Sequence, residues 1–458
     1  MAKFNMAWNR RYSIMSYARS SLWVVPVIAL IAAIILKRLS ERLGGWMVNQ
    51  GFYDLKTGFY ALTAPEAHSV LDRIFTLSLS CLVFTFGSLL VAIQVAGGQY
   101  TPRIIATTLL RDNVIRWIVG LFVFTMLWVN RTMLQLGNIP DVPQFQVFLG
   151  IIFGLISIVA FMVLIDYSAK LLRPVSLVSR VAEHGIEVIE SVYPYPTRNV
   201  AAPPKKHTLE FLSWGSQRSA LHKQPDIKRG APDRIIFHSG KSGIVLAVNL
   251  QGLVAEAQRA ESIIEFVPQI GDFIAVGEPL FYLFGNADAV DDRTLLALVA
   301  LGSERTMEQD PMFSFRIEVD IALKALSPAI NDPTTAVLAI DQLHRLLRMV
   351  GERSLYGHEI TDSAGKPRVV FRTPNWEDFV HITFTEIRLC GAGSIQIARR
   401  LRAMVINLTQ TLPEHRHPAL REQLDLLDRS IAQHLMFPED LAMAHIADSQ
   451  GLGGASHT

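Results

Sequence analysis

Four long apolar segments lie in the first 173 residues of this 458-residue chain, and the remainder holds none. The second and fourth segments carry no charged residue and are long enough to cross the hydrocarbon core of a bilayer as helices. The first has about 17 apolar residues, the lower limit for a span. The sequence therefore predicts a polytopic α-helical membrane protein with four transmembrane helices. The segments are Ser20–Leu36, Ile74–Gly98, the stretch between Asp112 and Arg131, and Phe145–Ile165.

The first apolar segment has two interpretations. Arg10, Arg11 and Arg19 precede it, as basic residues precede the apolar part of a secretory signal peptide. In that case a cleavage site with small residues would follow, whereas this chain continues with Lys37 and Arg38. We therefore expect a retained transmembrane anchor.

Basic residues near the segment ends predict the orientation, because Lys and Arg are in excess on the cytoplasmic side. With the N-terminus inside, ten lie on the cytoplasmic side and six outside, which favours a cytoplasmic N-terminus and C-terminal region. Residues 37–72 and 132–144 would then lie outside. The ten are Lys3, Arg10, Arg11, Arg19, Arg103, Arg111, Arg116, Lys170, Arg173 and Arg180; the six are Lys37, Arg38, Arg42, Lys56, Arg73 and Arg131.

The net charge of +2 conceals two regions of opposite sign. Residues 1–173 hold 15 Lys/Arg and 7 Asp/Glu, a net charge of +8, and the remainder holds 28 and 34, a net charge of −6. The acidic C-terminal region lacks the basic footprint of a nucleic-acid-binding domain, so no nucleic-acid partner is expected. The lipid bilayer is the expected partner of the basic region. Two cysteines, Cys81 and Cys390, are too few for a disulfide framework and fit a reducing cytoplasm.

The second apolar segment carries a stripe of small and polar residues. Ser80, Gly87 and Gln94 are spaced seven apart, so they share one helix face. Such a face is typical of a seam between packed helices, and it is also suited to line a pore or cavity. Both interpretations stay open. In the fourth segment, Gly150 and Gly154 form a GxxxG spacing that predicts close helix contact.

Three arginines are candidates for contacts with lipid headgroups. Arg103 and Arg111 flank a predicted short interfacial helix, 104–110, and Arg116 lies one turn inside the third segment. A structural elbow is the alternative for this connection. The spans hold none of the ionisable residues that mark proton relays, since Arg116 is near enough to the interface to reach it.

The rest of the chain predicts a cytoplasmic α+β domain, with a small β-hairpin module and a helical bundle. We divide the chain into a four-helix transmembrane domain at 1–173, a helical extension and Pro-rich linker at 174–232, a β module at 233–290 and a helical domain at 291–447. The stretch from Leu171 to Val192 is expected to continue the fourth span. Gly271–Leu280 predicts a hairpin, and 360–371 a second one. The predicted helices are Leu250–Ala260, Asp291–Leu301, Pro311–Leu326, Pro333–Met349, Asn375–Cys390, Ser394–Leu408, Pro418–Leu435 and Glu439–Ala447.

A turn rich in Pro and Asn joins two of these helices. Asp332 suits an N-cap and is followed by Pro333, which suits the first helical position. The simple interpretation is a well-capped turn. The functional alternative is that the exposed helix N-terminus holds a ligand or partner. The candidate residues of this turn and of the charge ladder before it are Arg316, Asp320, Asn331, Asp332 and Thr334.

No catalytic constellation is found in the sequence. HExxH, CxxC, GxSxG and Gly-rich dinucleotide motifs are missing. The glycine and leucine spacing of Gly271–Leu280 is similar to that of biotinyl and lipoyl carriers, but the lysine that carries their cofactor is absent. We therefore predict no catalytic residues, no metal and no cofactor, and whether the protein is an enzyme stays open with the balance against it.

Several motifs together resemble one bacterial family, known as the predicted membrane proteins of domain of unknown function 2254. The motifs are Gln99–Arg103, Arg111-Asp112, Glu304–Asp310, Arg316 and the long run Val319–Ala336. The resemblance covers roughly residues 15–435. It implies four N-terminal spans in a bacterial inner membrane and a cytoplasmic C-terminal domain, and it supplies no catalytic residues.

Three functions are compatible with these features. The first is a channel or permeation protein regulated by its cytoplasmic domain, which would need a homo-oligomer because four spans rarely enclose a pore alone. The second is a membrane-anchored sensor or scaffold whose cytoplasmic domain binds a ligand or protein partner. The third, a lipid-modifying enzyme, lacks an acid/base or metal set. The sequence favours the first.

Overall fold

The computed structural model describes residues 7–49, 62–99, 112–136, 142–171, 173–197, 230–355, 359–362 and 364–454. Its contacts divide the chain into two compact units, 17–98 with 102–177 and 1–16 with 99–101 and 178–458. The residues before Tyr17 thus group with the C-terminal unit rather than with the apolar helices that follow them.

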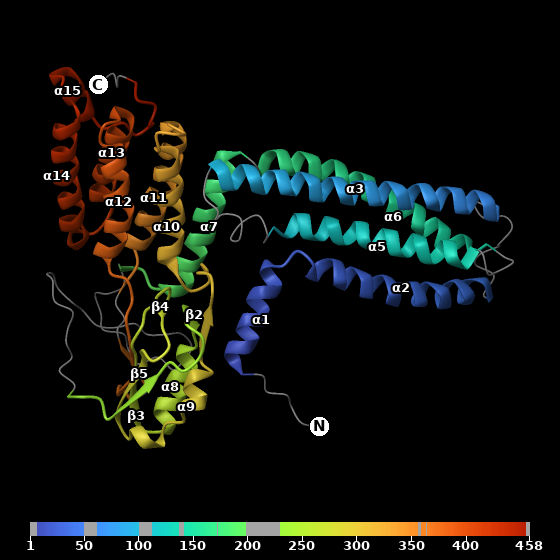
Figure 1. The fold of residues 1–458 in the computed structure, drawn as a ribbon, viewed down its shortest axis with the longest axis horizontal. Helices are drawn as coiled ribbons and strands as arrows, with labels where there is room; N and C mark the ends of the chain where they lie inside the picture. Colours follow the sequence, from blue (N-terminus) through green and yellow to red (C-terminus); the bar gives the residue numbers. More distant parts are fainter. Residues whose placement is uncertain are drawn as a thin grey trace. The chain divides into compact units, whose positions relative to one another are not determined.

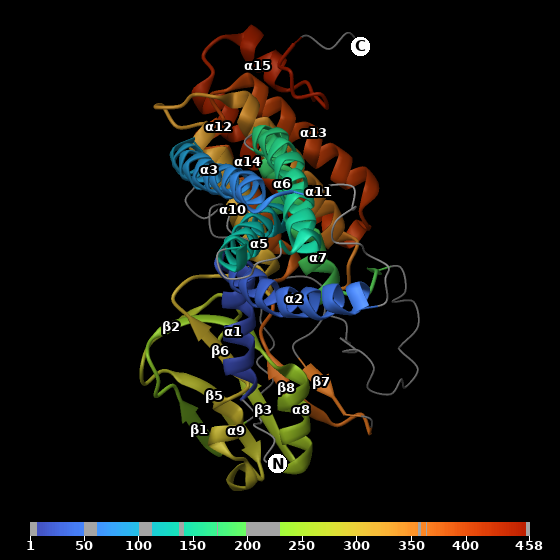
Figure 2. The same ribbon diagram turned by 90° about the vertical axis from the view of Figure 1, so that its right-hand side faces the viewer.

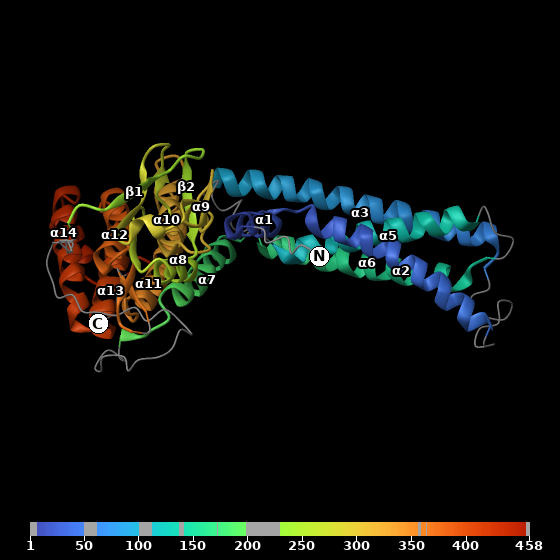
Figure 3. The same cartoon turned by 90° about the horizontal axis from the view of Figure 1, so that it is seen from below.

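The first unit is a bundle of long helices, α2 (Val24–Asn49), α3 (Ala64–Gln99), α5 (Asn113–Leu136) and α6 (Gln144–Leu171), which run side by side in Figures 1 and 3. Among the described residues, α3, α5 and α6 are long and apolar enough to cross a membrane. In α2 the apolar run is interrupted by Lys37, Arg38 and Glu41. The structure thus supports three of the four predicted spans by length and composition.

Glycines bring the helices of this bundle together. A Cβ on Gly150 would lie 3.0 Å from Leu71, and one on Gly154 would lie 2.8 Å from Ile74. The GxxxG spacing of α6 therefore packs against α3, and the predicted close helix contact is confirmed. Gly120 on α5 gives the same close approach to Val25 on α2.

The fourth apolar segment does not continue as one helix into the C-terminal unit. Helix α6 ends at Leu171, and a separate helix, α7 (Pro174–Val192), begins with a proline. Proline has no amide hydrogen and clashes with the preceding turn, so it starts a helix but does not sit within one. The expectation of a continuous extension was wrong for this reason.

The described residues of the C-terminal unit form two β-sheets. The larger has the strand order β1-β5-β3-β8-β7, visible across Figure 2, and the smaller has the order β4-β2-β6. The strands are β1 (Arg234–Phe237), β2 (Gly243–Val248), β3 (Ser262–Phe266), β4 (Phe273–Ile274), β5 (Pro279–Gly285), β6 (Val299–Gly302), β7 (Glu359–Thr361) and β8 (Pro367–Phe371). Helices α8 (Leu250–Arg259) and α9 (Asp292–Leu296) and the short turn η3 (Ala287–Ala289) complete this region.

Two predictions for the β region were wrong in detail. Strands β4 and β5 belong to different sheets, so Gly271–Leu280 is not a hairpin. The predicted helix Asp291–Leu301 ends early, and Val299–Gly302 pairs with β2 as a strand. The predicted hairpin at 360–371 is confirmed as β7 and β8, and β8 also pairs in parallel with β3. One hydrophobic core therefore joins residues far apart in sequence, among them Val245, Phe281 and Val369.

The other helices match the predicted ones within a few residues. They are α10 (Pro311–Ala325), α11 (Pro333–Gly351), α12 (Trp376–Gly391), α13 (Ile395–Thr411), α14 (His417–His434) and α15 (Pro438–Ala444), with the short turn η4 (Glu414–Arg416) before α14. Helix α7 packs on this bundle, since a Cβ on Gly185 would meet the Ser314 side chain at 2.7 Å and Leu346 at 3.0 Å. The N-terminal helix α1 (Trp8–Ser20), which the sequence did not predict, packs Trp8 and Tyr12 against the smaller sheet.

Candidate functional site

Helix α3 has two faces of different character. Small and apolar side chains on one face are buried within the bundle, and two of its hydroxyl groups lie there as well. The Thr85 hydroxyl donates to the Cys81 carbonyl at 2.7 Å, so it is satisfied within the helix. This face packs against the rest of the unit. Its residues are Ser78, Cys81, Thr85, Leu89 and Ala92.

The predicted stripe lies on the other face. Ser80, Gly87 and Gln94 are all exposed in the single chain, and a Cβ added at Gly87 would meet nothing within 4 Å. The Ser80 hydroxyl donates to the Thr76 carbonyl at 2.8 Å. The Gln94 amide makes no hydrogen bond to another residue of the described ranges. Among the described residues, the stripe therefore lies on the exposed face of α3 and not on the face that packs within this bundle.

A buried lysine lies between the helices of the same unit. The Lys37 side chain on α2 is 4% exposed, and its ammonium group donates to the Thr132 hydroxyl at 2.7 Å and to the Gln146 amide oxygen. It also lies 5.1 Å from the centre of the Trp128 ring. The sequence placed Lys37 at the end of an apolar segment, outside the membrane. Its burial was missed because the helix continues for another twelve residues, to Asn49.

The structure describes one of the three arginines that were candidates for headgroup contacts. Arg103 and Arg111 lie outside the described residues. Arg116 is buried, and its guanidinium group donates to the Ala18 carbonyl at 2.8 Å. The start of α5 beside it is capped by Asp112, whose carboxylate accepts from the Val114 amide at 2.9 Å and from the Tyr167 hydroxyl. Arg116 thus connects the start of α5 to the chain before α2.

The Pro/Asn turn has the geometry of a capped connection. The Asp332 carboxylate accepts from the Thr335 amide at 3.0 Å and from the Thr335 hydroxyl at 2.5 Å. Asn331 has φ 49°, a left-handed conformation that asparagine tolerates better than most residues. Thr334 is exposed at the first turn of α11. The predicted helix, turn and capped helix are therefore all present, and the cap carboxylate already occupies the helix N-terminus.

The charge ladder belongs to a different part of the fold. The Arg316 guanidinium group donates to Asp320 at 2.7 Å and pairs with Glu386 on α12. Its hydrogen bond to Glu386 holds the pKa of that carboxyl below the ordinary value. About 14 Å of helix separates Arg316 from the end of α10 at Ala325. Arg316 therefore lies more than two turns of helix before the turn that holds Asn331 and Asp332.

The segment Glu304–Asp310 connects the smaller sheet to α10 through specific contacts. Asp310 caps α10 by accepting from the Phe313 amide at 3.2 Å, and it pairs with Arg305. Burial raises the pKa of Asp310, and the ion pair with Arg305 opposes that effect. The Gln309 amide oxygen accepts from the Val248 amide of β2 at 3.1 Å. These contacts fix the connection between sheet and helix bundle.

Glu318 on α10 is a buried carboxyl group that sequence analysis did not single out. It is 0% exposed, and neither carboxyl oxygen has a hydrogen-bond partner among the described residues. Burial raises its pKa well above the ordinary value of 4.5. The available signal was its spacing: Ser314 and Ile321, at four residues before and three after, lie on the same buried face.

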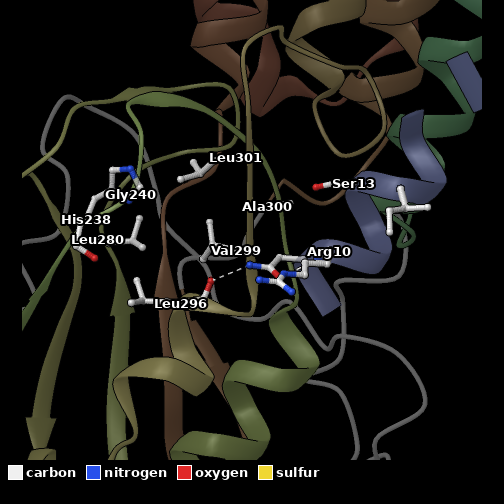
Figure 4. A pocket seen from close by; sticks show the side chains of 12 residues that line it. Arg10, Ser13, His238, Gly240, Leu280, Leu296, Val299, Ala300 and Leu301 are labelled. Carbon is white, nitrogen blue, oxygen red and sulfur yellow. Dashed lines mark hydrogen bonds between the residues drawn. The ribbon is translucent and has the colours of Figure 1, made fainter. Parts of the chain in front are cut away.

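A cavity of about 490 Å³ lies between α1 and the β region (Figure 4). Arg10 and Ser13 line it from α1, and His238 and Gly240 line it from the loop between β1 and β2. Apolar residues of β5, α9 and β6 also line it; they are Leu280, Leu296, Val299, Ala300 and Leu301. All of these residues belong to the C-terminal unit.

Helix α1 is held at this cavity by hydrogen bonds. The Asn9 backbone amide donates to the Ala297 carbonyl at 3.0 Å, and the Ser16 hydroxyl donates to Glu308 at 3.1 Å. His238 is buried, and its Nε2 atom lies 2.9 Å from the Lys241 carbonyl oxygen, which fixes the ring. No group of three or more potential metal ligands occurs in the part of the chain that the structure describes.

Comparison with known proteins adds a family match and three relatives. A family model described as predicted membrane protein (DUF2254) matches residues 19–407. An uncharacterized protein of Mycobacterium bovis and two uncharacterized proteins of Mycobacterium tuberculosis strains are each 22% identical to this chain over 453 residues. The alignment covers 95% of this chain and 81% of each relative. No solved structure shows a significant match.

Proposed function

Because the chain belongs to the DUF2254 family of predicted membrane proteins, we propose that it is a homo-oligomeric channel or permeation protein of a bacterial inner membrane, regulated by a cytoplasmic C-terminal domain. The family match confirms the resemblance carried by Val319–Ala336. The observation that supports the channel proposal most directly is the exposed polar stripe of α3.

Gln94 in the stripe needs a partner that the described residues of the chain do not supply. A glutamine amide facing hydrocarbon would leave its hydrogen-bonding groups unsatisfied, at a cost of several kcal/mol. Water or a second copy of the chain relieves that cost for Gln94. The space at Gly87 lets another helix approach closely, as small residues do in membrane interfaces. Copies of α3 arranged around a common axis would give the Gln94 amide water or another chain to bond with. They would also allow a close helix contact at Gly87.

Helix α2 is the proposed fourth span. Its charged residues disfavour a lipid-facing position, but Lys37 points into the bundle and is satisfied by Thr132 and Gln146. A charged residue that faces the bundle interior and is paired is compatible with a membrane helix. Arg38 and Arg42 are exposed and are proposed to reach the outer headgroups.

The burial of Lys37 also supports the proposed orientation. Six basic residues were assigned to the outer side, and one of them, Lys37, is in the bundle rather than in a flanking loop. Arg116, one of the ten on the cytoplasmic side, is buried as well, so the comparison becomes nine against five. Both termini and the C-terminal domain are proposed to be cytoplasmic on this basis.

Gln94→Leu tests the channel directly. If the stripe faces a water-filled path, ion flux through reconstituted vesicles changes relative to the wild type. Val95→Leu, one position along the same helix and about 100° around it, is the matched control and should leave flux unchanged. The channel proposal would be contradicted if wild-type flux were at background and Gln94→Leu changed only the stability of the oligomer. The stripe would then be a packing seam between helices.

The alternative is a membrane-anchored sensor or scaffold. The cavity between α1 and the β region favours it, because a ligand there would contact a helix that ends only three residues before α2 begins. The oligomeric state in detergent distinguishes the two proposals. A monomer would contradict the channel proposal and would be consistent with the sensor proposal.

A further inference from the structure

The cavity at α1 combines an apolar wall with one cationic side chain. Leu280 and Val299 are 1% and 4% exposed, so the wall belongs to the folded core of the β region. The volume of about 490 Å³ lies within the range of small-molecule sites. Such sites are mostly apolar and carry few polar groups, and those polar groups determine the orientation of the ligand.

The polar groups of the cavity lie mainly on the α1 side. Figure 4 shows Arg10 and Ser13 directed from α1 toward Leu296, Val299 and Leu301. No carboxylate of the described residues pairs with the Arg10 guanidinium group. The neighbouring His238 ring is held by the contact of its Nε2 atom with the Lys241 carbonyl oxygen at 2.9 Å. Arg10 is thus the charged group in the cavity lining that remains available for a ligand.

We propose that this cavity binds a small amphipathic anion, with a phosphate or carboxylate group at Arg10 and an apolar body against the partly exposed Leu296 and Leu301. A guanidinium group binds such oxyanions through parallel hydrogen bonds. Ser13 adds a hydroxyl donor one turn further along α1. The proposal concerns binding alone and holds whether or not the protein conducts ions.

Phenyl phosphate is a suitable probe, because it carries both features and is water-soluble. The full-length protein in phosphatidylcholine nanodiscs is titrated calorimetrically with phenyl phosphate, inorganic phosphate and benzyl alcohol. Saturable binding of phenyl phosphate is expected, with affinity about tenfold or more above that of either fragment.

Two arginine variants provide the matched test. Arg10→Ala should weaken phenyl phosphate binding about tenfold or more, as expected for a lost charge-assisted hydrogen bond. Arg11→Ala removes the same charge from the next position of α1, which does not line the cavity, and should leave affinity unchanged. Ser13→Trp, at an exposed position, should fill the space and abolish binding.

Several outcomes would overturn the proposal: no saturable binding by the wild type, equal affinity of Arg10→Ala and wild type, or inorganic phosphate binding as tightly as phenyl phosphate. A second titration in nanodiscs containing phosphatidylglycerol identifies the natural source of the anion. Weaker apparent binding there that persists in high salt, where repulsion by the anionic bilayer is screened, would indicate that a lipid headgroup competes for the cavity, and unchanged binding would indicate a free small anion.

Discussion

Replacing Glu318 with methionine is expected to stabilise the C-terminal unit. The side chain is fully buried, and both carboxyl oxygens lack a hydrogen-bond partner among the described residues. In the unfolded chain, water solvates the same group. Folding therefore carries the full desolvation cost of the carboxyl group. Methionine has a similar length, an equally favourable helix propensity and no group that requires a partner.

The magnitude follows from the cost of an unsatisfied buried polar group, about 1–3 kcal/mol. Removing that cost from a unit of this size should raise the melting temperature by roughly 2–12 °C. Glu386 provides the matched control, because it is half exposed and paired with Arg316. Glu386→Met should change stability by about 0–1 kcal/mol in the opposite direction.

The carboxyl group also gives the stability a defined pH dependence. Burial raises the pKa of Glu318 well above its ordinary value of 4.5, so the folded chain keeps the proton where the unfolded chain releases it. Relative to the ionised form, the protonated Glu318 side chain favours the folded state. This favourable effect on the free energy of unfolding is fully present below about pH 4.5 and is lost progressively as the pH rises toward the folded-state pKa. Glu318→Gln cannot titrate, so it should remove this part of the slope.

Thermal unfolding of the full-length protein in detergent, followed by circular dichroism between pH 5 and pH 8, measures both effects. A lower melting temperature for Glu318→Met would refute the reasoning, since it would show that the carboxyl group has a partner that stabilises it. An unchanged pH slope in Glu318→Gln would equally contradict the raised pKa.

Two further predictions concern the turn and the orientation. Asp332→Ala should lower the free energy of unfolding by about 0.5–2 kcal/mol, because it removes the acceptor of the Thr335 amide; lost activity with unchanged stability in chemical denaturation would instead support a ligand role. In whole cells, a membrane-impermeant maleimide should label a cysteine at Thr57, which lies outside the described residues, and spare one at Ser239; the reverse pattern would contradict the proposed orientation.

Local signals predicted the helices of the C-terminal unit well. Asp310 and Asp332 each precede a proline and begin a helix, because a side-chain cap and a fixed φ act within a few residues. The strands were harder. Val299–Gly302 continues an apolar run from α9, and periodicity alone does not separate a buried strand from a helix there. The parallel pairing of β8 with β3 depends on contacts about a hundred residues apart.

The candidate site residues show the same limit. The stripe of α3 was recognisable because its seven-residue spacing is a property of one helix. Lys37 and Glu318 were not, since each looks like an ordinary solvent-facing charge in the sequence. Their burial depends on Trp128 and Gln146 around Lys37 and on the packing of several helices around α10. Tertiary structure alone determines that environment.

Cysteine crosslinking at Gly87 tests the central claim most directly, that α3 lines the common interface of a homo-oligomer. Cys81 and Cys390 are both free and are first replaced by alanine and serine. The account predicts that Gly87→Cys forms crosslinks between chains in native membranes, whereas Val159→Cys, on the exposed face of α6, does not. Absent crosslinks at Gly87, or equal crosslinking at both positions, would contradict the central interface.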